Sequence, residues 1–459
     1  MTKKTFFLDQ HGCAKNQVDG ELIISRLTAL GMERVDDAAD AELIIINSCG
    51  FIESAKKESL DALMDARAAY PAAKILLAGC LAERYAKVFE TELPEADGIF
   101  GNGDLSQIDS AAKSLFDGGR PVLCPPQKGV CGGDRNLLLS FKGSAYVKIT
   151  EGCNNHCSFC AIPLIRGALR SRRISEIVDE IRQLVAQGVR EINLVGQDLA
   201  AYGYGADDDI FSEGKSPLLQ LMEQIAGIEG DFWVRLLYIH PDHFNPDILA
   251  FMKTDRRFLP YFDIPFQSGD NKIIRAMNRT GSFDSYLHLV QSIREAFPES
   301  CIRTTFLTGF PGETAEAAEN TERFLRAIES DWSGCFCYSR EEDTPAEKMK
   351  GQVPKKTAEA RAARLEAIQA AITEKRLRSR CGAVYDVLVE EVIENKGGDD
   401  DGLAIGRAWF EAPEVDGNVV IRYELDDEEA VRAVVPGARV KVKALHSSEL
   451  DIDGVYIGQ

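Results

Sequence analysis

The chain has 459 residues, which is too long for one hydrophobic core and predicts about three domains. Its 45% hydrophobic and 27% charged residues are typical of a globular protein, and no apolar run approaches the ~20 residues that cross a bilayer, which argues against a membrane protein. The net charge of −20 argues against a chain that binds nucleic acid over its whole surface. No secretory leader pattern is present at the amino terminus, so we expect a cytoplasmic protein without disulfides. Of its 12 cysteines we expect about half to serve metal binding or catalysis and about half to be small buried hydrophobic residues.

Residues 1–120 predict an α/β domain with a parallel sheet. Three apolar strands, KTFFLDQHG, AELIIINSCG and AKILLAGC, alternate with helical stretches such as Val18 to Leu30 and Ser54 to Ala69. Apolar runs of this length with helices between them are typical of parallel strands that are covered on both faces. The Gly- and Pro-rich segment that follows predicts a linker over residues 121–138.

Residues 139–379 predict a second α/β domain, a partial (βα)6 barrel. Its expected strands are AYVKITEG, EINLVGQD, FWVRLLYIH, YFDIPFQSG, IRTTFLTGFPG and SGCFCYSR, and six right-handed parallel crossovers would curl into an open barrel. A long helix is expected from Lys355 to Arg380. Residues 380–459 change character, with short strands (VYDVLVEEVI, VVIRYEL, ARVKVKAL, GVYIG) and turn-rich joints that predict a small antiparallel β-barrel of the oligomer-binding type. The fold class is therefore α/β multidomain.

Three cysteines follow the first strand of the predicted barrel. Cys153, Cys157 and Cys160 are spaced C-x3-C-x2-C, and three thiolates can bind three irons of a four-iron cluster while the fourth iron stays open for chemistry. A zinc site or a redox pair are the alternatives, but structural zinc needs a fourth ligand at a spacing that His156 does not provide. The spacing and its location resemble the radical S-adenosylmethionine superfamily.

That resemblance implies a cofactor bound at the open iron. One electron then cleaves S-adenosylmethionine to methionine and a 5′-deoxyadenosyl radical, while the protein orients the cofactor and excludes solvent. Phe159 matches an aromatic that packs beside the cluster and adenine, although core filling explains it equally well. Gln197 ends the second strand, and Gly309 and Gly312 follow the fifth, where cofactors bind such folds; the glycines also suit plain turns.

A second set of cysteines is dispersed in sequence but equivalent in position. Cys13, Cys49 and Cys80 lie at the ends of the first three strands, and the carboxyl ends of parallel strands meet at one edge of a sheet. We expect them to converge and hold a second cluster. The remaining six cysteines, among them Cys335 and Cys337, are interpreted as strand or core residues.

Two three-cysteine sets and a terminal β-barrel resemble the radical S-adenosylmethionine methylthiotransferases over nearly the whole chain. The family implies an amino-terminal methylthiotransferase domain, a radical core and a carboxy-terminal TRAM domain, with two 4Fe-4S clusters. One S-adenosylmethionine donates a methyl group, another supplies the radical, and the second cluster presents sulfur. The local sequence is similar to the ribosomal-protein branch (RimO type), which modifies the β-carbon of an aspartate on small-subunit ribosomal protein twelve. The matching segments are HGCAKNQVDGE, SCGFIESAKKESL, EGCNNHCSFCAIPLIRGALRSR and GRAWFEAPEVDG.

Charge supports a protein substrate. Cys381 to Gln459 carries 7 basic and 18 acidic residues, a balance of −11 that would repel RNA and attract a basic ribosomal protein. The basic helix 355–380 favours the opposite and is a candidate for contact with RNA. An electron donor such as flavodoxin or ferredoxin is also expected. The alternatives are a transfer-RNA adenosine methylthiotransferase, a non-enzymatic iron–sulfur redox sensor and an RNA-binding module with structural metal.

Overall fold

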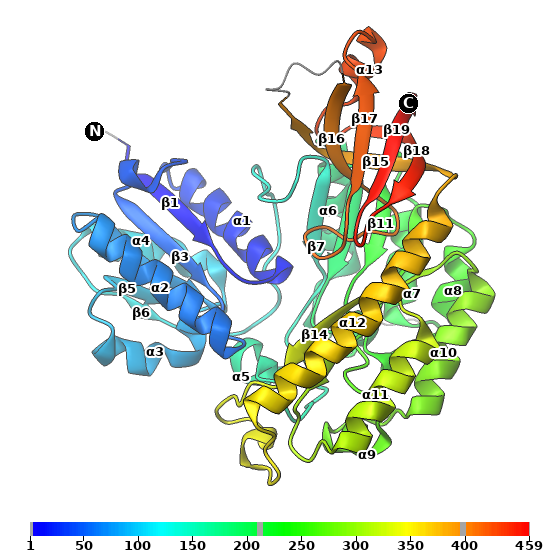
Figure 1. The fold of residues 1–459 in the computed structure, drawn as a ribbon. Coiled ribbons are helices and arrows are strands. Elements are labelled where there is room, and N and C mark those ends of the chain that lie inside the picture. The colour runs from blue at the N-terminus through cyan, green and yellow to red at the C-terminus, as the bar shows by residue number, and fades with distance from the viewer. Residues whose placement is uncertain (1–2, 209–213, 395–400, 459) are drawn as a thin grey trace.

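The computed structural model describes residues 3–208, 214–394 and 401–458, which form three packed units in chain order (Figure 1). The arrangement confirms the predicted fold class: a parallel-sheet unit, an open barrel of parallel strands and a small closed β-barrel. Among the described helices, none is long and apolar enough to cross a bilayer.

The amino-terminal unit is a six-stranded parallel sheet with two helices on each face. One face packs against α1 and α4 and the other against α2 and α3, in two separate hydrophobic clusters. Every residue of β3 is buried, as a strand covered on both faces requires. The strand order is β2-β1-β3-β4-β5-β6. The elements are β1 (Thr5–Gln10), α1 (Ala14–Ala29), β2 (Glu33–Arg34), η1 (Ala38–Asp40), β3 (Leu43–Ser48), α2 (Glu53–Ala69), β4 (Lys74–Gly79), α3 (Cys80–Glu92), β5 (Gly98–Phe100), η2 (Leu105–Gln107), α4 (Ile108–Phe116) and β6 (Val122–Leu123).

The central unit has six parallel strands whose order in space, β14-β13-β12-β11-β10-β7, follows their order in the chain. Within the described residues β7 and β14 do not pair, so the barrel is open. Its strands are β7 (Ser144–Lys148), β10 (Glu191–Val195), β11 (Trp233–Leu236), β12 (Phe258–Asp263), β13 (Cys301–Thr308) and β14 (Trp332–Cys337). A short antiparallel pair, β8 (Thr150–Glu151) and β9 (Arg170–Ser171), flanks the cysteine loop and α5 (Ile162–Arg166).

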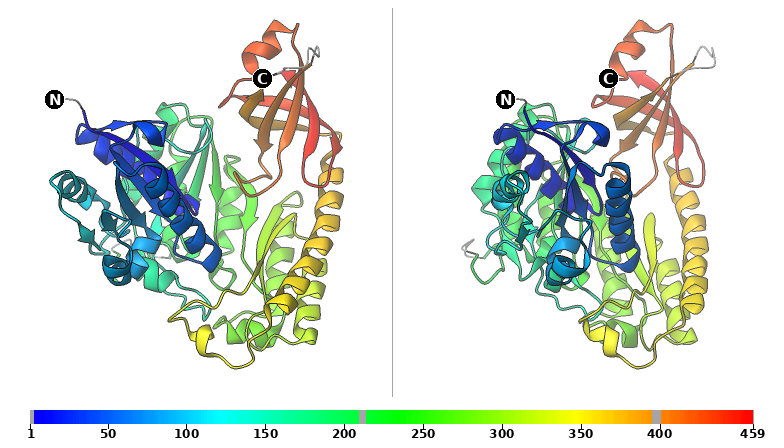
Figure 2. Two further views of the ribbon diagram at one scale, coloured as in Figure 1. Left: turned by 60° about the vertical axis from the view of Figure 1, so that its left-hand side comes forward. Right: turned by 90° about the vertical axis from the view of Figure 1, so that its left-hand side faces the viewer.

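Helices cover the outer surface of the open barrel. The longest, α12 (Lys355–Arg380), has the predicted bounds and runs along the central unit to the terminal barrel (Figure 2). The others are α6 (Ile174–Ala186), η3 (Leu199–Ala201), α7 (Pro217–Ala226), η4 (Pro241–His243), α8 (Asp247–Met252), α9 (Asn271–Ala276), α10 (Phe283–Ala296), α11 (Ala315–Ile328) and η5 (Pro345–Lys348).

The carboxy-terminal unit is a closed five-stranded barrel with the order β15-β16-β17-β19-β18. It is antiparallel except for β17 and β19, which pair in parallel, a detail that the sequence did not reveal. The strand β16 was not predicted. The elements are β15 (Val384–Ile393), β16 (Asp401–Ala408), β17 (Val419–Glu424), α13 (Glu428–Ala433), β18 (Arg439–Ser447) and β19 (Ile452–Gly458).

The terminal barrel docks on the amino ends of the central strands. Glu191, the first residue of β10, accepts hydrogen bonds from Arg235 and from Arg407 of the barrel, and all three side chains are buried. The loop after β16 continues this contact, because the carbonyl of Phe410 accepts hydrogen bonds from Trp332 Nε1 and Cys301 Sγ. The terminal barrel therefore covers the amino ends of the central strands, and it leaves the carboxyl ends of these strands uncovered.

Candidate active site

All six predicted cluster cysteines line one cavity of 420 Å³ between the amino-terminal and central units. Cys13, Cys49 and Cys80 form part of one wall, and Cys153, Cys157 and Cys160 part of the other. No described residue of the terminal barrel lines it. The structure thus brings together two sets of thiols that are far apart in sequence, since the first set ends at Cys80 and the second begins at Cys153.

The loop of Cys153 to Cys160 is fixed by hydrogen bonds to its neighbours. Cys160 N donates to the carbonyl of Cys157 at 3.0 Å, and Asn155 Nδ2 donates to the buried Asp198 carboxylate at 2.9 Å. His156 adopts a left-handed backbone with φ +50°, a conformation that is costly outside glycine and that marks a constrained loop. The loop is therefore held in one conformation by the protein.

Close backbone packing brings the amino-terminal cysteines together. β1, β3 and β4 are neighbours in the sheet, so Cys13 before α1, Cys49 after β3 and Cys80 at the start of α3 emerge at the same edge. A Cβ on Gly12 (φ +88°) would lie 3.0 Å from Cys49 Cβ, and one on Gly50 would lie 2.7 Å from the carbonyl of Cys80. Only glycine allows the three turns to approach this closely.

The thiols fit iron–sulfur clusters better than a single metal ion. All six are free. Burial in the cavity wall raises the pKa of Cys49 and of Cys160 to about 12, an effect that a bound cation would oppose. Burial also opposes ionisation of Cys13, but Lys15 and Arg166 outweigh it and lower the pKa of that thiol. Three sulfurs on one zinc ion would lie about 3.8 Å apart, whereas in a cubane each binds a different iron and they lie further apart. Among the described residues no three His, Cys, Asp or Glu side chains are placed to share one ion.

Two of the residues predicted to bind the cofactor line the same cavity. Phe159 is half-buried beside the cysteine loop. Gln197 donates from Nε2 to Glu151 at 3.0 Å, while its Oε1 is buried without a hydrogen-bond partner. A buried, unpaired acceptor at the cavity wall fits a ligand that brings N–H or O–H donors, as the amino and hydroxyl groups of S-adenosylmethionine do.

The two predicted glycines do not line this cavity. Gly309 (φ +76°) packs against α12, where a Cβ would lie 2.4 Å from that of Ala358. Gly312 (φ +85°) donates its N–H to the carbonyl of Gly351. A direct role for either glycine in cofactor binding stays a prediction, and both have a structural reason to be glycine.

Several cavity residues were not found from the sequence. Lys15 Nζ donates to the carbonyl of Gly196 at 3.2 Å and lies 3.9 Å from the centroid of the Tyr238 ring. Tyr238 and Gln267 both have left-handed backbones, with φ +65° and +70°. Strained residues concentrate at functional sites, which supports the assignment of the cavity. The sequence feature that could have identified these residues is their position, since Lys15 lies two residues after Cys13 and Tyr238 lies just after a strand of the central barrel.

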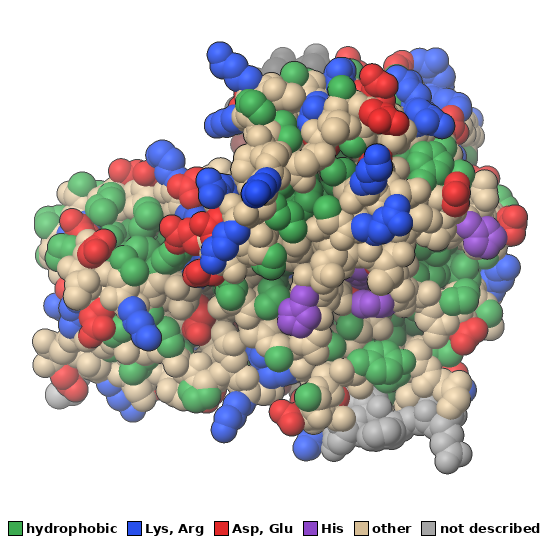
Figure 3. Space-filling view, turned by 90° about the horizontal axis from the view of Figure 1, so that it is seen from below, with side chains coloured by type: hydrophobic (Ala, Val, Ile, Leu, Met, Phe, Trp, Pro, Cys, Tyr) green, Lys and Arg blue, Asp and Glu red, His purple; other side chains and the backbone are tan. Residues whose placement is uncertain are grey.

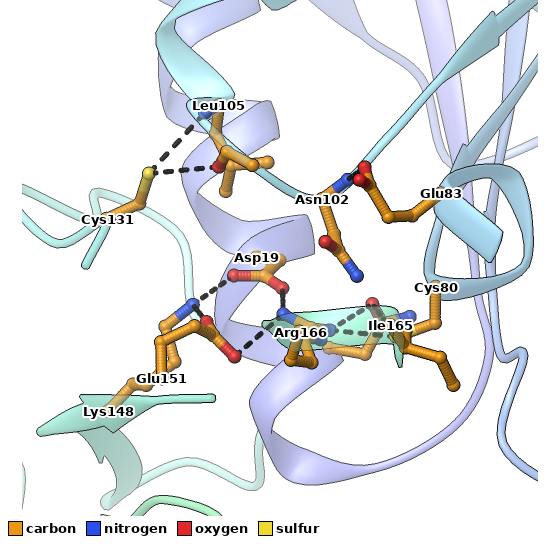
Figure 4. Close-up of polar contacts among 12 residues, drawn as sticks. Asp19, Cys80, Glu83, Asn102, Leu105, Cys131, Lys148, Glu151, Ile165 and Arg166 are labelled. Carbon is orange, nitrogen blue, oxygen red and sulfur yellow. Dashed lines mark hydrogen bonds and ion pairs between the residues drawn. The ribbon is translucent and has the colours of Figure 1, made fainter. Parts of the chain in front are cut away.

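A buried ionic network joins the two walls of the cavity (Figure 4). Arg166, six residues after Cys160, donates from Nη2 to Cys80 Sγ at 3.0 Å and from Nη1 to Asp19 of α1 at 2.6 Å. Lys148 of β7 bonds to both Asp19 and Glu151. Burial raises the pKa of Glu151, but Arg166 and Lys148 outweigh burial and lower it. Arg166 therefore ties one cysteine set to the loop that carries the other.

We expect Arg166→Met to destabilise the protein by about 3–5 kcal/mol, because the change leaves the buried carboxylates of Asp19 and Glu151 with one cation instead of two. The matched control is Arg182→Met, which removes an exposed ion pair with Asp179 and should cost about 0–1 kcal/mol. Urea unfolding followed by circular dichroism measures both. Equal losses in the two variants would contradict the bridging role.

Comparisons with known proteins agree with this architecture. The radical SAM superfamily matches residues 147–325, the uncharacterized protein family UPF0004 residues 5–101, and the TRAM domain residues 381–457. The chain is 52% identical to the ribosomal protein uS12 methylthiotransferase RimO of Treponema denticola over 98% of this chain and 100% of the relative. It is 38% identical to the RimO protein of Thermotoga maritima, over 90% of this chain and 92% of the relative.

A solved structure shares the fold at low sequence identity. The radical S-adenosylmethionine methyltransferase TsrM of Kitasatospora setae, with cobalamin and a 4Fe-4S cluster bound, matches with a TM-score of 0.53 and 14% identity over 75% of this chain and 74% of that chain. The domain matches, the full-length relatives and the cavity with its cysteine loop agree. This chain belongs to the RimO methylthiotransferases, a family of radical S-adenosylmethionine enzymes that use a 4Fe-4S cluster.

Proposed function

We propose that this enzyme replaces a β-hydrogen of an aspartate on ribosomal protein uS12 with a methylthio group. The observation that carries the proposal is the single cavity onto which all six cysteines converge, in a chain whose full-length relatives are named uS12 methylthiotransferases. Cys153, Cys157 and Cys160 would hold the cluster that cleaves S-adenosylmethionine. Cys13, Cys49 and Cys80 would hold a second 4Fe-4S cluster beside it.

An unactivated C–H bond explains why such a cavity is needed. No side-chain base can remove a hydrogen of this kind, whereas the cluster and its cofactor, when bound, supply a radical that can. The chain's own residues make much of the cavity wall apolar, since Phe51, Phe159 and Phe336 line it together with Ile162 and Pro163. Lys15 and Gln197 place polar groups at its wall, where they can orient a carboxylate or the cofactor.

The distribution of charge favours a basic protein over RNA as the substrate. The helix α12 has eight Lys and Arg residues, but seven of them form ion pairs with Asp or Glu side chains of this chain. Its charge is therefore largely neutralised within the protein. In the terminal barrel Glu390, Glu411 and Asp416 are buried or half-buried in the docking contact, whereas Asp426, Glu428 and Glu429 are exposed. A second candidate acidic patch is Asp399 to Asp401: Asp401 is exposed, and Asp399 and Asp400 lie outside the described residues.

The exposed acidic turn at α13 is expected to speed the encounter with uS12. Changing Asp426 and Asp427 to Asn and Glu428 and Glu429 to Gln should lower the association rate at low salt and reduce its salt dependence, while each charge contributes only about 0–1 kcal/mol. Asn at 427 keeps the helix cap, because the Asp427 side chain accepts from the N–H groups of Glu429 and Ala430. Stopped-flow or surface-based binding across a salt series measures the effect.

The matched control for this turn neutralises four exposed acidic residues of the amino-terminal unit: Asp65, Glu90, Glu92 and Asp117. This control variant removes the same number of negative charges, but from the amino-terminal unit instead of the terminal barrel. If both quadruple variants slow association equally, the barrel has no special part in recruitment. Cofactor cleavage in the absence of uS12 should be unchanged in both.

The substrate assignment is tested by mass spectrometry of uS12 and of transfer RNA from cells with and without this enzyme. We expect the methylthio group on one aspartate of uS12 only when the enzyme is present. Loss of a methylthio group from transfer-RNA adenosine instead would move the assignment to the transfer-RNA branch. A one-electron donor of the flavodoxin or ferredoxin class would complete the reaction in the cell.

A further inference from the structure

His240 lies between the cluster loop and a second cavity. The residue lies between β11 and η4, is 8% exposed, and its Nε2 is 3.9 Å from Cys157 Sγ. The neighbouring cavity measures 580 Å³, and Asn155 and His240 line both cavities. This end of the molecule is seen from below in Figure 3, where histidine side chains reach the surface near its middle. His240 therefore lies between this second cavity and a predicted iron ligand.

The hydrogen bonds of the ring decide which nitrogen carries the proton. The backbone N–H of Asp242 donates to His240 Nδ1 at 3.3 Å. A donor can approach only a lone pair, so Nδ1 is unprotonated and the neutral ring carries its proton on Nε2. That N–H is the one directed at the sulfur of Cys157. The contact is thus an N–H···S hydrogen bond in which the Cys157 sulfur accepts.

Both partners of this bond are fixed by one buried carboxylate. Asp198, 1% exposed, accepts from the backbone N–H of His240 at 3.2 Å and from Asn155 Nδ2 at 2.9 Å. Asn155 belongs to the cysteine loop, so the carboxylate holds the donor and the acceptor segments in register. His243 Nδ1 also bonds to Asp198, at 2.9 Å, and its ring stacks on that of His240, but no hydrogen bond joins it to a cysteine among the described residues.

A hydrogen bond to a cluster sulfur stabilises the reduced state more than the oxidised state, because reduction adds one negative charge. We propose that His240 is a positioning residue that raises the reduction potential of the cluster on Cys153, Cys157 and Cys160, which eases its reduction by a low-potential one-electron donor. The step adds one electron to the cluster and neither breaks a bond nor moves a proton. The inference rests on the proposed cluster ligands but not on the identity of the substrate.

The test is a redox titration of the reconstituted full-length enzyme, followed by electron paramagnetic resonance. The cluster is identified as the signal that changes when S-adenosylmethionine is added. His240→Phe and His240→Leu remove the donor and should lower the midpoint potential; a tenfold loss of preference for the reduced state corresponds to about 59 mV. His240→Gln keeps an N–H donor and should retain most of the native potential. His243→Phe is the matched control and should leave the potential unchanged.

Each variant is first checked for iron content and circular dichroism, so that a folding defect is distinguished from a shift in potential. A native potential in both variants without a donor, or equal shifts for His240→Phe and His243→Phe, would overturn the inference. If no signal responds to S-adenosylmethionine, the ligand assignment fails and the inference with it. If the potential shifts as expected but uS12 is not modified, the inference stands and the proposed substrate is wrong.

Discussion

Replacing any one of Cys153, Cys157 and Cys160 with Ala is expected to abolish the reductive cleavage of S-adenosylmethionine. Each thiolate would supply one of the three iron bonds, and three protein ligands on a four-iron cluster leave one iron open for the cofactor. Formation of 5′-deoxyadenosine after anaerobic reconstitution, with dithionite as the reductant, is the measurement. The expected loss is complete rather than partial, because two thiolates leave one further iron of the cluster without its protein ligand.

Cys381→Ala is the matched control for these variants. Its thiol lies outside the cavity and donates to the carbonyl of Leu377 at 3.7 Å. This variant should form 5′-deoxyadenosine at the native rate. Native cleavage by any of the three cavity variants would instead show that the cluster lies elsewhere.

The triple variant Cys13→Ala, Cys49→Ala and Cys80→Ala is expected to separate radical formation from sulfur insertion. The native chain should bind roughly eight irons as two four-iron clusters, and the triple variant roughly four. It should still cleave S-adenosylmethionine, because the other wall of the cavity is intact, but it should yield no methylthiolated product. Iron analysis, Mössbauer spectroscopy and product mass spectrometry measure the three quantities.

The control for the triple variant replaces Cys124 and Cys131, which lie outside the cavity. Cys131 Sγ accepts from the N–H of Leu105 at 3.4 Å, as an ordinary structural thiol does. This double variant should keep all its iron and its product. If instead the triple variant kept eight irons and the double variant lost four, the second cluster would belong to Cys124 and Cys131.

The convergence of Cys13, Cys49 and Cys80 could be expected from the sequence because it follows from one rule of parallel sheets. Each residue follows an apolar strand, and strands that alternate with helices run in one direction. Cys153, Cys157 and Cys160 lie in one short loop, so their proximity could be expected from sequence spacing alone, without any rule about the sheet. Local patterns therefore placed both sets of thiols, and the structure adds that they line one cavity.

Features that depend on contacts between units could not be expected in this way. Nothing near Arg166 indicates that it bonds to Cys80, 86 positions away, or that Lys15 reaches Gly196. The basic composition of α12 suggested an RNA surface. Its positive charge is instead largely neutralised by acidic partners such as Glu322 of α11 and Asp331, which directly precedes β14. The strand β16 was missed because Gly402 and Gly406 weaken its pattern; Tyr423 and Leu388 occupy the space above them.

The most direct test of the central claim uses uS12 deuterated at the β-carbon of its aspartates. We expect the reconstituted enzyme, with S-adenosylmethionine, a reductant and sulfide, to move deuterium into 5′-deoxyadenosine and to leave a methylthio group on one aspartate of uS12. Both products are measured by mass spectrometry in the same reaction. Deuterium-free 5′-deoxyadenosine together with unmodified uS12 would contradict the account.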